Sequence, residues 1–252
     1  MKLVTYNIRF DGGLDGNNNF CYRQPLILKK ITEENPDIIC FQEVLEHVAD
    51  WLKENLTEYV VVGCGREADL GGEQMTVAYK RSNFNMMRME TYWMSETPYV
   101  PGSRHKEQSM CPRTCTELVL FEKESGKIFR VINTHLDHEG AAARIRGLEQ
   151  ILKKLDEENF FPGVPVVVAG DFNVEPDGEE LQVILNAPGF VDATEGIGAT
   201  WHDFMRQPDC KQIDYVFIRG EICCEGVEKW TDEDNGVYLS DHFPVSCILK
   251  LK

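Results

Sequence analysis

The chain has 252 residues, of which 42% are hydrophobic, and it contains no linker-like stretch, fixed repeat or low-complexity tract, so it predicts a single domain over residues 1–252 with a large core. Its 42 acidic and 26 basic residues give a net charge of −16, which counts against avid binding to long duplex DNA. No apolar stretch approaches the roughly 18 to 20 residues of a membrane span, and the N-terminal MKLVTYNIRF lacks the apolar run of a secretory signal.

The nine cysteines indicate a reducing environment. They include no CxxC pair, and Cys40, Cys64 and Cys247 lie in strand-like apolar stretches where a reduced thiol packs as a small hydrophobic group. We therefore expect a soluble, cytoplasmic protein.

Hydrophobic periodicity predicts alternating strands and helices in the first part of the chain. Residues 2–8 alternate as a strand, and residues 25–34 have helical spacing. A short apolar strand at 37–41 ends at Gln42-Glu43, and a helix is expected at 46–56.

The rest of the chain is rich in predicted strands. They are expected at residues 60–62, 75–80, 85–92, 114–122, 127–133, 165–169, 213–219, 223–230 and 244–251. Helices are expected at 141–158, where an apolar stripe includes Leu148 and Ile151, and at 179–185. This order predicts an α/β protein with two sheets packed face to face and helices outside.

Polar residues recur where the apolar runs end. They are Asn7, Glu43, His135 with Asp137, Asp171 with Asn173, Asp214, and the pair Asp241-His242. A single polar residue at a strand end usually begins a solvated loop, but six such positions are harder to explain in that way. Strand ends at one sheet edge lie side by side, and buried carboxylates need a cation or hydrogen-bond donors, so these groups could converge in one cleft.

The same segments carry a family resemblance. In order, NIR, QE, NTHLD, GDFN, IDYVF and SDH resemble the motifs of the endonuclease/exonuclease/phosphatase superfamily, and they cover the chain from Asn7 to His242. YWMSETP at 92–98 and THLDHEGAAAR at 134–144 resemble an uncharacterised bacterial branch of it. The resemblance implies a four-layer α/β/β/α sandwich and divalent-metal-dependent hydrolysis of a phosphate ester.

Oxygen ligands dominate the candidate metal site. The carboxylates of Glu43 and Asp241 and the amide of Asn7 suit Mg²⁺ or Mn²⁺, which bind substrate phosphate directly. No HExxH motif or Cys/His cluster favours zinc. Asn7 is also a candidate substrate contact.

Asp171 is the candidate general base, and the Asn173 amide could orient the attacking water or the phosphate. A carboxylate with a pKa of about 4 is a weak base, so this role requires burial or a charged neighbour to raise the pKa.

The resemblance assigns two histidines. It pairs His242 with Asp214, which would favour an imidazolium that donates to a phosphate oxygen. It places His135 across the site, where Glu73 could be its carboxylate partner. Asp137 could be a further hydrogen-bond acceptor or simply cap the end of its strand.

Further residues are candidate substrate contacts. The resemblance favours Arg113, which precedes the strand at 114–122. The basic loop residues Arg104, His105 and Lys106 could meet a phosphate or be solvated. Trp201 and His202 could flank a leaving group or anchor their loop by packing.

The expected function is a metal-dependent phosphoesterase, specifically a phosphodiesterase or nuclease acting on a small phosphodiester or on short or single-stranded nucleic acid. A phosphoinositide or sphingomyelin-type substrate is an alternative, which the lack of a polybasic patch or amphipathic helix disfavours. A catalytically silent binding module is a second alternative. It would be expected to have lost a metal or base residue, and Glu43, Asp171, Asp241 and His242 are all present.

Overall fold

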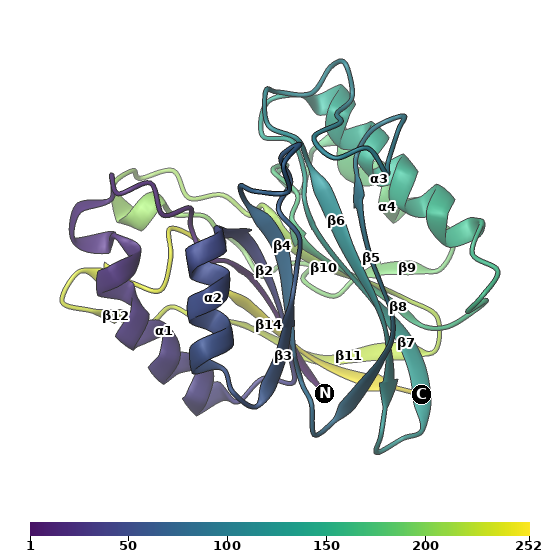
Figure 1. Ribbon diagram of the computed structural model, residues 1–252, viewed down its shortest axis with the longest axis horizontal. Helices are drawn as coiled ribbons and strands as arrows, with labels where there is room; N and C mark the ends of the chain where they lie inside the picture. The colour runs from purple at the N-terminus through teal and green to yellow at the C-terminus, as the bar shows by residue number, and fades with distance from the viewer.

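A computed structural model describes residues 1–252 as two six-stranded β-sheets packed face to face. Figure 1 shows α1 and α2 against one sheet and α3 and α4 against the other, on opposite sides of the molecule. The four layers α/β/β/α confirm the expected fold class. No helix is long and apolar enough to cross a membrane.

The first sheet has the strand order β11-β14-β1-β2-β4-β3. Its strands are β1 (Lys2–Asn7), β2 (Ile38–Val44), β3 (Tyr59–Val62), β4 (Gln74–Lys80), β11 (Ile222–Lys229) and β14 (Val245–Leu251). β1 and β2 are parallel, whereas β14 runs antiparallel to β1. The helices α1 (Phe20–Glu34) and α2 (Glu46–Asn55) cover the outer face of this sheet.

The second sheet has the strand order β5-β6-β7-β8-β10-β9. Its strands are β5 (Phe84–Trp93), β6 (Thr114–Glu122), β7 (Lys127–His135), β8 (Val166–Asp171), β9 (Phe190–Asp192) and β10 (Asp214–Arg219). β7 and β8 are parallel, and β10 is antiparallel to β8. α3 (Ala141–Asp156) and α4 (Gln182–Leu185) cover its outer face, and β12 (Glu233–Asp234) and β13 (Val237–Tyr238) form a separate small hairpin.

Three buried clusters hold the layers together. One lies between the sheets and includes Leu3, Val131 and Val167. The second joins the first sheet to α1 and α2, and the third joins the second sheet to α3 and α4. Both faces of each sheet are therefore buried, which explains why several strands are nearly continuous apolar runs rather than alternating ones.

Most expected elements are present, with shifted ends. The first helix begins at Phe20 rather than at residue 25, and Pro25 lies inside it. Although proline removes one helical hydrogen bond, burial of Phe20, Arg23 and Ile27 stabilises the turns on both sides of it. The strands β9, β12 and β13 were not predicted, because two or three residues are too few to show a periodic pattern.

Candidate active site

The polar strand ends meet at one edge of the two sheets. Asn7, His135 and Asp171 are the last residues of β1, β7 and β8, and Glu43 lies near the end of β2. Asp214 begins β10, which is antiparallel to β8 and pairs it directly with Asp171. Asp241 and His242 precede β14, which is antiparallel to β1. Carboxyl ends of parallel strands and amino ends of their antiparallel neighbours therefore share this edge.

Glu43 is held by the segment that follows β1. The Asn7 Nδ2 donates to Glu43 Oε1 at 2.9 Å, and the Phe10 backbone N–H donates to Oε2 at 2.5 Å. Glu43 itself has a left-handed backbone (φ 62°) where the register of β2 against β4 shifts. Burial opposes its charge, but these hydrogen bonds and the nearby His242 cation leave the pKa of Glu43 lowered, so it stays a carboxylate.

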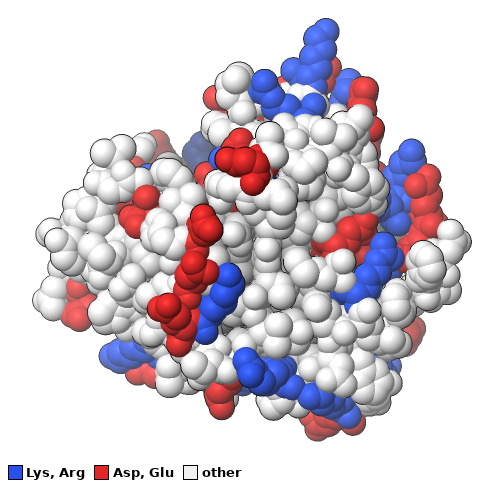
Figure 2. Space-filling model, in the orientation of Figure 1, with Lys and Arg blue, Asp and Glu red and all other residues white.

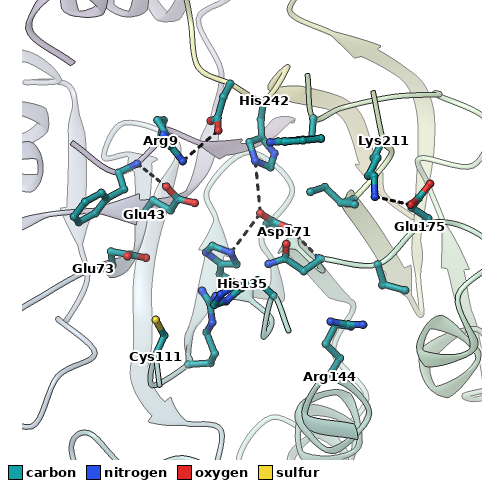
Figure 3. A pocket seen from close by; sticks show the side chains of 18 of the residues that line it. Arg9, Glu43, Glu73, Cys111, His135, Arg144, Asp171, Glu175, Lys211 and His242 are labelled. Atoms are coloured by element: carbon teal, nitrogen blue, oxygen red, sulfur yellow. Dashed lines mark hydrogen bonds and ion pairs between the residues drawn. The ribbon is translucent and has the colours of Figure 1, made fainter. Parts of the chain in front are cut away.

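Asp171 lies at the centre of the site, between His135 and His242 (Figure 3). Its Oδ2 is 3.1 Å from Asn7 Nδ2, 3.4 Å from His135 Nε2 and 3.8 Å from His242 Nε2. The Asn173 backbone N–H donates to its Oδ1 at 2.9 Å. Burial, reinforced by the negative charge of Asp214, raises the pKa of Asp171 to about 7. This is the change that a carboxylate needs to act as a base near neutral pH.

His242 is paired with a buried carboxylate. Its Nδ1 lies 2.8 Å from Asp214 Oδ2, which also accepts a hydrogen bond from Thr200 Oγ1 at 2.6 Å. Burial alone would lower the pKa of His242, but the charge and hydrogen bond of Asp214 raise it to about 10. The ring is therefore an imidazolium that donates to Asp214 through Nδ1 and presents its Nε2–H to the site.

His135 has the opposite character. Burial and the nearby charge of Arg113 hold its pKa well below the usual value, so the imidazole is neutral. The expected pairing with Glu73 is not formed, because the Glu73 carboxylate accepts two hydrogen bonds from Arg66 at 2.6 and 2.7 Å. Glu73 still lines the cleft, with its pKa raised by burial and by the charge of Glu43.

The carboxylates fit a hard divalent cation. Ligand atoms of Glu43, His135 and Asp171 lie within 4.8 Å of one another, and Asp241 lies outside this group, so its ligation stays a prediction. Burial raises the pKa of Asp171 and Asp241, as expected where acidic groups lack a full complement of positive charge. The Asn7 amide nitrogen, rather than its oxygen, faces Glu43 and Asp171. Asn7 therefore positions these carboxylates here, and direct ligation by its oxygen stays a prediction that requires the reversed amide.

Glu43, His135, Asp171 and Asp241 line a cleft of about 880 Å³, whereas Asn7 is buried behind it and does not line it. Figure 3 shows Arg144 and Lys211 across the cleft from Glu43 and Arg9. Arg113 lies in the same cleft but is only 4% exposed, and its Nη2 contacts His138 Nδ1 at 3.0 Å. Its Nε and Nη1 are buried and have no hydrogen-bond partner, so two charged donors are left unsatisfied beside the cleft.

Of the two aromatic candidates, Trp201 faces the cleft and His202 packs in the interior. Trp201 lines the cleft and bridges to the backbones of His242 and Lys211. His202 is buried and stacks on Phe243 with ring centroids 4.0 Å apart, which matches the packing alternative.

Two groups of loop residues do not contribute side chains to the cleft. The basic residues Arg104, His105 and Lys106 do not line the cleft. Asp137 accepts hydrogen bonds from the backbones of Ser109, Glu139 and Gly140, so it organises loops in the way the capping alternative describes.

Sequence reasoning missed five cationic or imidazole groups of the cleft: Arg9, Arg66, His138, Arg144 and Lys211. Arg9 and His138 follow polar strand ends by two or three residues, and this proximity is a usable signal. Arg144 lies on α3 and Lys211 on a loop, and nothing in their local pattern distinguishes them from solvated side chains.

A sequence model of the Endonuclease/Exonuclease/phosphatase family matches residues 4–242. The chain belongs to this family. Members of the Endonuclease/Exonuclease/phosphatase family are metal-dependent phosphoesterases that include phosphodiesterases, nucleases and phosphatases. The match spans every polar strand end from Asn7 to His242.

Similar proteins differ in the activities that their names record. An endonuclease/exonuclease/phosphatase from Bacteroides vulgatus shares 32% identity, covers 100% of this chain and 98% of its own, and superposes with a TM-score of 0.93. A mannosyl-6-phosphatase from Bacteroides thetaiotaomicron shares 25% identity over 99% of both chains with a TM-score of 0.89. Human 2',5'-phosphodiesterase 12 is 25% identical over 66% of this chain, which spans only 30% of that longer protein.

Proposed function

We propose that this protein is a divalent-metal-dependent phosphoesterase, with Mg²⁺ or Mn²⁺ as its ion, that hydrolyses a small phosphodiester or short, single-stranded nucleic acid by attack of water. The observation that carries the proposal is the position of Asp171. It lies between a neutral His135 and a cationic His242, beside the Glu43 carboxylate. A base, a phosphate-facing cation and a candidate metal ligand thus share one cleft.

Each residue has a definite task in this proposal. Asp171 accepts the proton of the attacking water, and the Asn173 side chain, fixed by its hydrogen bond to the Leu136 carbonyl, orients that water or the phosphate. His242 donates Nε2–H to a phosphate oxygen, with Asp214 keeping it charged.

The two walls of the cleft hold the substrate between them. Glu43 and Asp241, with Asn7 beside them, would hold the metal, which polarises the phosphoryl group when bound. Arg113, which lines the same cleft, binds a non-bridging oxygen of the phosphate. Neutral His135 stabilises charge on the phosphate or leaving group, and Trp201 packs against the leaving group.

A small substrate suits the dimensions and charge of the molecule. The net charge of −16 disfavours a long polyanion. On the face shown in Figure 2, acidic and basic side chains lie in small mixed groups rather than in a broad basic surface. A cleft of about 880 Å³ accommodates a compact phosphate compound or the end of a short strand.

A sugar phosphate monoester is a second candidate. Only 5 of the 22 residues that line the cleft are hydrophobic, and such a polar lining suits the hydroxyls of a sugar. The similar structure of a mannosyl-6-phosphatase supports the same candidate. Lipid phosphoesters are less well matched, because so polar a cleft offers little to an acyl chain.

The test is a substrate panel assayed with Mg²⁺ and with Mn²⁺. It should contain single-stranded oligonucleotides, dinucleotides, mannose 6-phosphate, inositol phosphates and sphingomyelin. Asp171→Asn should lower kcat on the best substrate by about 1,000-fold or more, because it removes the base. Asp177→Asn, an exposed aspartate on the loop after β8, is the matched control and should keep normal turnover.

Two results would contradict the proposal. Near-normal turnover of a folded Asp171→Asn enzyme would remove the base from the mechanism. A wild-type protein that hydrolyses none of the panel with either metal would favour the silent binding module.

Glu43→Gln should raise the Mg²⁺ concentration needed for half-maximal activity, because it removes a charged ligand of the proposed metal site.

A further inference from the structure

The Arg9 guanidinium lies beside two of the residues proposed to hold the metal, and neither the family resemblance nor the proposed mechanism gives it a role. Its Nη1 is 3.5 Å from Asp241 Oδ2. The Arg9 backbone has φ 65°, and its N–H donates to Asn7 Oδ1 at 3.0 Å. The backbone N–H of the next residue, Phe10, donates to the Glu43 carboxylate. Figure 3 shows Arg9 next to Glu43 at the wall of the cleft.

Asp15 fixes the guanidinium in this place. Arg9 Nε donates to Asp15 Oδ2 at 3.1 Å, and Nη2 lies 3.4 Å from Oδ1. On its other side Asp15 contacts Arg206, whose Nη1 is 3.3 Å from Oδ1 and whose Nη2 is 3.2 Å from the backbone oxygen. Asp15 is buried, and its single negative charge faces two guanidinium groups. Arg206 also lies 3.6 Å from Asp203 Oδ1, so Arg9 is the cation of this group that faces Asp241.

Backbone contacts keep the Arg9 segment and the Asp241 segment in register. Arg23, which is fully buried, donates from Nη1 to the carbonyls of Ile8 at 2.7 Å and Leu239 at 2.9 Å. The carbonyl of Asp241 accepts hydrogen bonds from the backbone N–H groups of His202 and Asp203, which begin the turn that carries Arg206. The cation is thus built into the frame of the site and is not a mobile surface arginine.

A fixed cation at this position competes with metal ions for the same carboxylates. A guanidinium is charged at every accessible pH, and that of Arg9 lies against the carboxylates of Asp15 and Asp241. It already offsets part of the negative charge of Glu43 and Asp241. A second divalent ion placed on this flank would meet a permanent positive charge at short range.

We propose that Arg9 is a built-in cation of the active site that takes the place of a second metal ion, so that the cleft binds a single divalent ion. Arg9 is then a positioning residue that sets the charge of the site and orients Asp241. This inference rests on the proposed metal-dependent function and deepens it.

The test counts bound Mn²⁺ directly on the full chain, by isothermal titration calorimetry and by the loss of free Mn²⁺ signal in electron paramagnetic resonance. Wild-type protein should bind one Mn²⁺ per chain. Arg9→Gln should either bind its Mn²⁺ at least about 5-fold more tightly or bind a second ion, because the competing charge is gone.

Two controls separate local from general charge effects. Arg9→Lys keeps a cation and should keep the stoichiometry of one. Arg206→Gln removes the same charge from the other side of Asp15, without contact to Asp241, and should change the Mn²⁺ affinity by less than about 2-fold. Circular dichroism establishes that each variant is folded.

The outcomes are distinct. Two Mn²⁺ ions bound with similar affinity by the wild type would overturn the inference even if the Arg9→Gln variant does not fold, and would leave the proposed function intact. A folded Arg9→Gln with one ion at unchanged or weaker affinity would also overturn it. Absence of any Mn²⁺ or Mg²⁺ binding by the wild type would contradict the proposed function itself, and the inference with it.

Discussion

Burial acts on His135 and His242 in the same direction, yet the two rings carry different charges because their neighbours differ. His242 contacts Asp214 at 2.8 Å and is cationic, whereas His135 has Arg113 nearby and is neutral. One ring can therefore donate to a phosphate oxygen as a cation while the other stays uncharged next to Asp171. The acid and base assignments depend on these pairings and not on residue type alone.

Asp214→Asn should remove the carboxylate that keeps His242 cationic. Without the carboxylate, the pKa of His242 should fall well below about 10, because burial is then opposed only by the charges of Asp241 and Asp171. We expect kcat at neutral pH to fall by about 100-fold or more. NMR titration of the His242 ring protons measures the pKa, and a pKa that stays near 10 in the variant would show that Asp214 is not its cause.

The same pair gives a pH dependence of stability. The folded-state pKa of His242 is raised above its unfolded value of about 6.5, so its contribution is fully present below pH 6.5. It is lost as the pH rises towards 10. The gap in the free energy of unfolding between wild type and Asp214→Asn should therefore be larger at pH 6 than at pH 10, as measured by urea denaturation.

At the scale of elements, Gly170 allows β8 to lie close to β7. Its φ is +152°, and a Cβ added there would lie 1.9 Å from the Thr134 carbonyl oxygen. The close approach sets Asp171, the next residue, directly opposite His135 in the parallel register. No other residue type fits this position without moving one of the two strands.

Gly170→Ala should lower the free energy of unfolding by about 3 kcal/mol and reduce turnover, because the clash involves backbone atoms and moves Asp171. Gly126→Ala is the control. Gly126 also has a positive φ, +70°, but nothing lies within 4 Å of an added Cβ, so only the backbone cost of about 1 kcal/mol should appear. Equal losses in the two variants, measured by urea denaturation, would show that the clash is relieved.

At the scale of the whole molecule, a buried amide links the two sheets. Asn133 on β7 donates from Nδ2 to the carbonyls of Phe41 at 2.7 Å and Thr76 at 2.9 Å, both in the first sheet. Its Oδ1 accepts from Gln42 Nε2 at 2.8 Å. These polar contacts lie at the edge of an otherwise apolar interface, close to the active-site end of both sheets, so they fix how one sheet is placed over the other.

Asn133→Leu should lower the free energy of unfolding by about 3 kcal/mol, because two buried carbonyls lose a donor and Gln42 Nε2 keeps only its acceptors on Thr5 and Cys40. Asn85→Leu, an exposed position on β5 of the same sheet, should change stability by less than about 0.5 kcal/mol. Urea denaturation of both variants provides the measurement. A loss below 1 kcal/mol in Asn133→Leu would mean that apolar packing alone holds the sheets in place.

The sequence predicts the layers and the polar strand ends because both leave local patterns. Apolar runs such as VVVAGD predict a strand and place a carboxylate at its end. Pairings between distant segments leave no such pattern. Glu73 was expected beside His135 but pairs instead with Arg66, seven residues away in the chain. No local pattern around Arg9 indicates that Asp15, itself in contact with Arg206, would hold it beside Asp241. These contacts depend on loop conformations that periodicity does not encode.

The active site takes residues from both sheets. Asn7 and Glu43 lie on the first sheet and Asp241 on the loop that leads into its strand β14, whereas His135, Asp171 and Asp214 lie on the second. The turnover rate therefore depends directly on the position of one sheet relative to the other. At denaturant concentrations too low to melt either sheet, a small slip between them would separate Glu43 from Asp171, and turnover should decline before circular dichroism reports any loss of strands or helices.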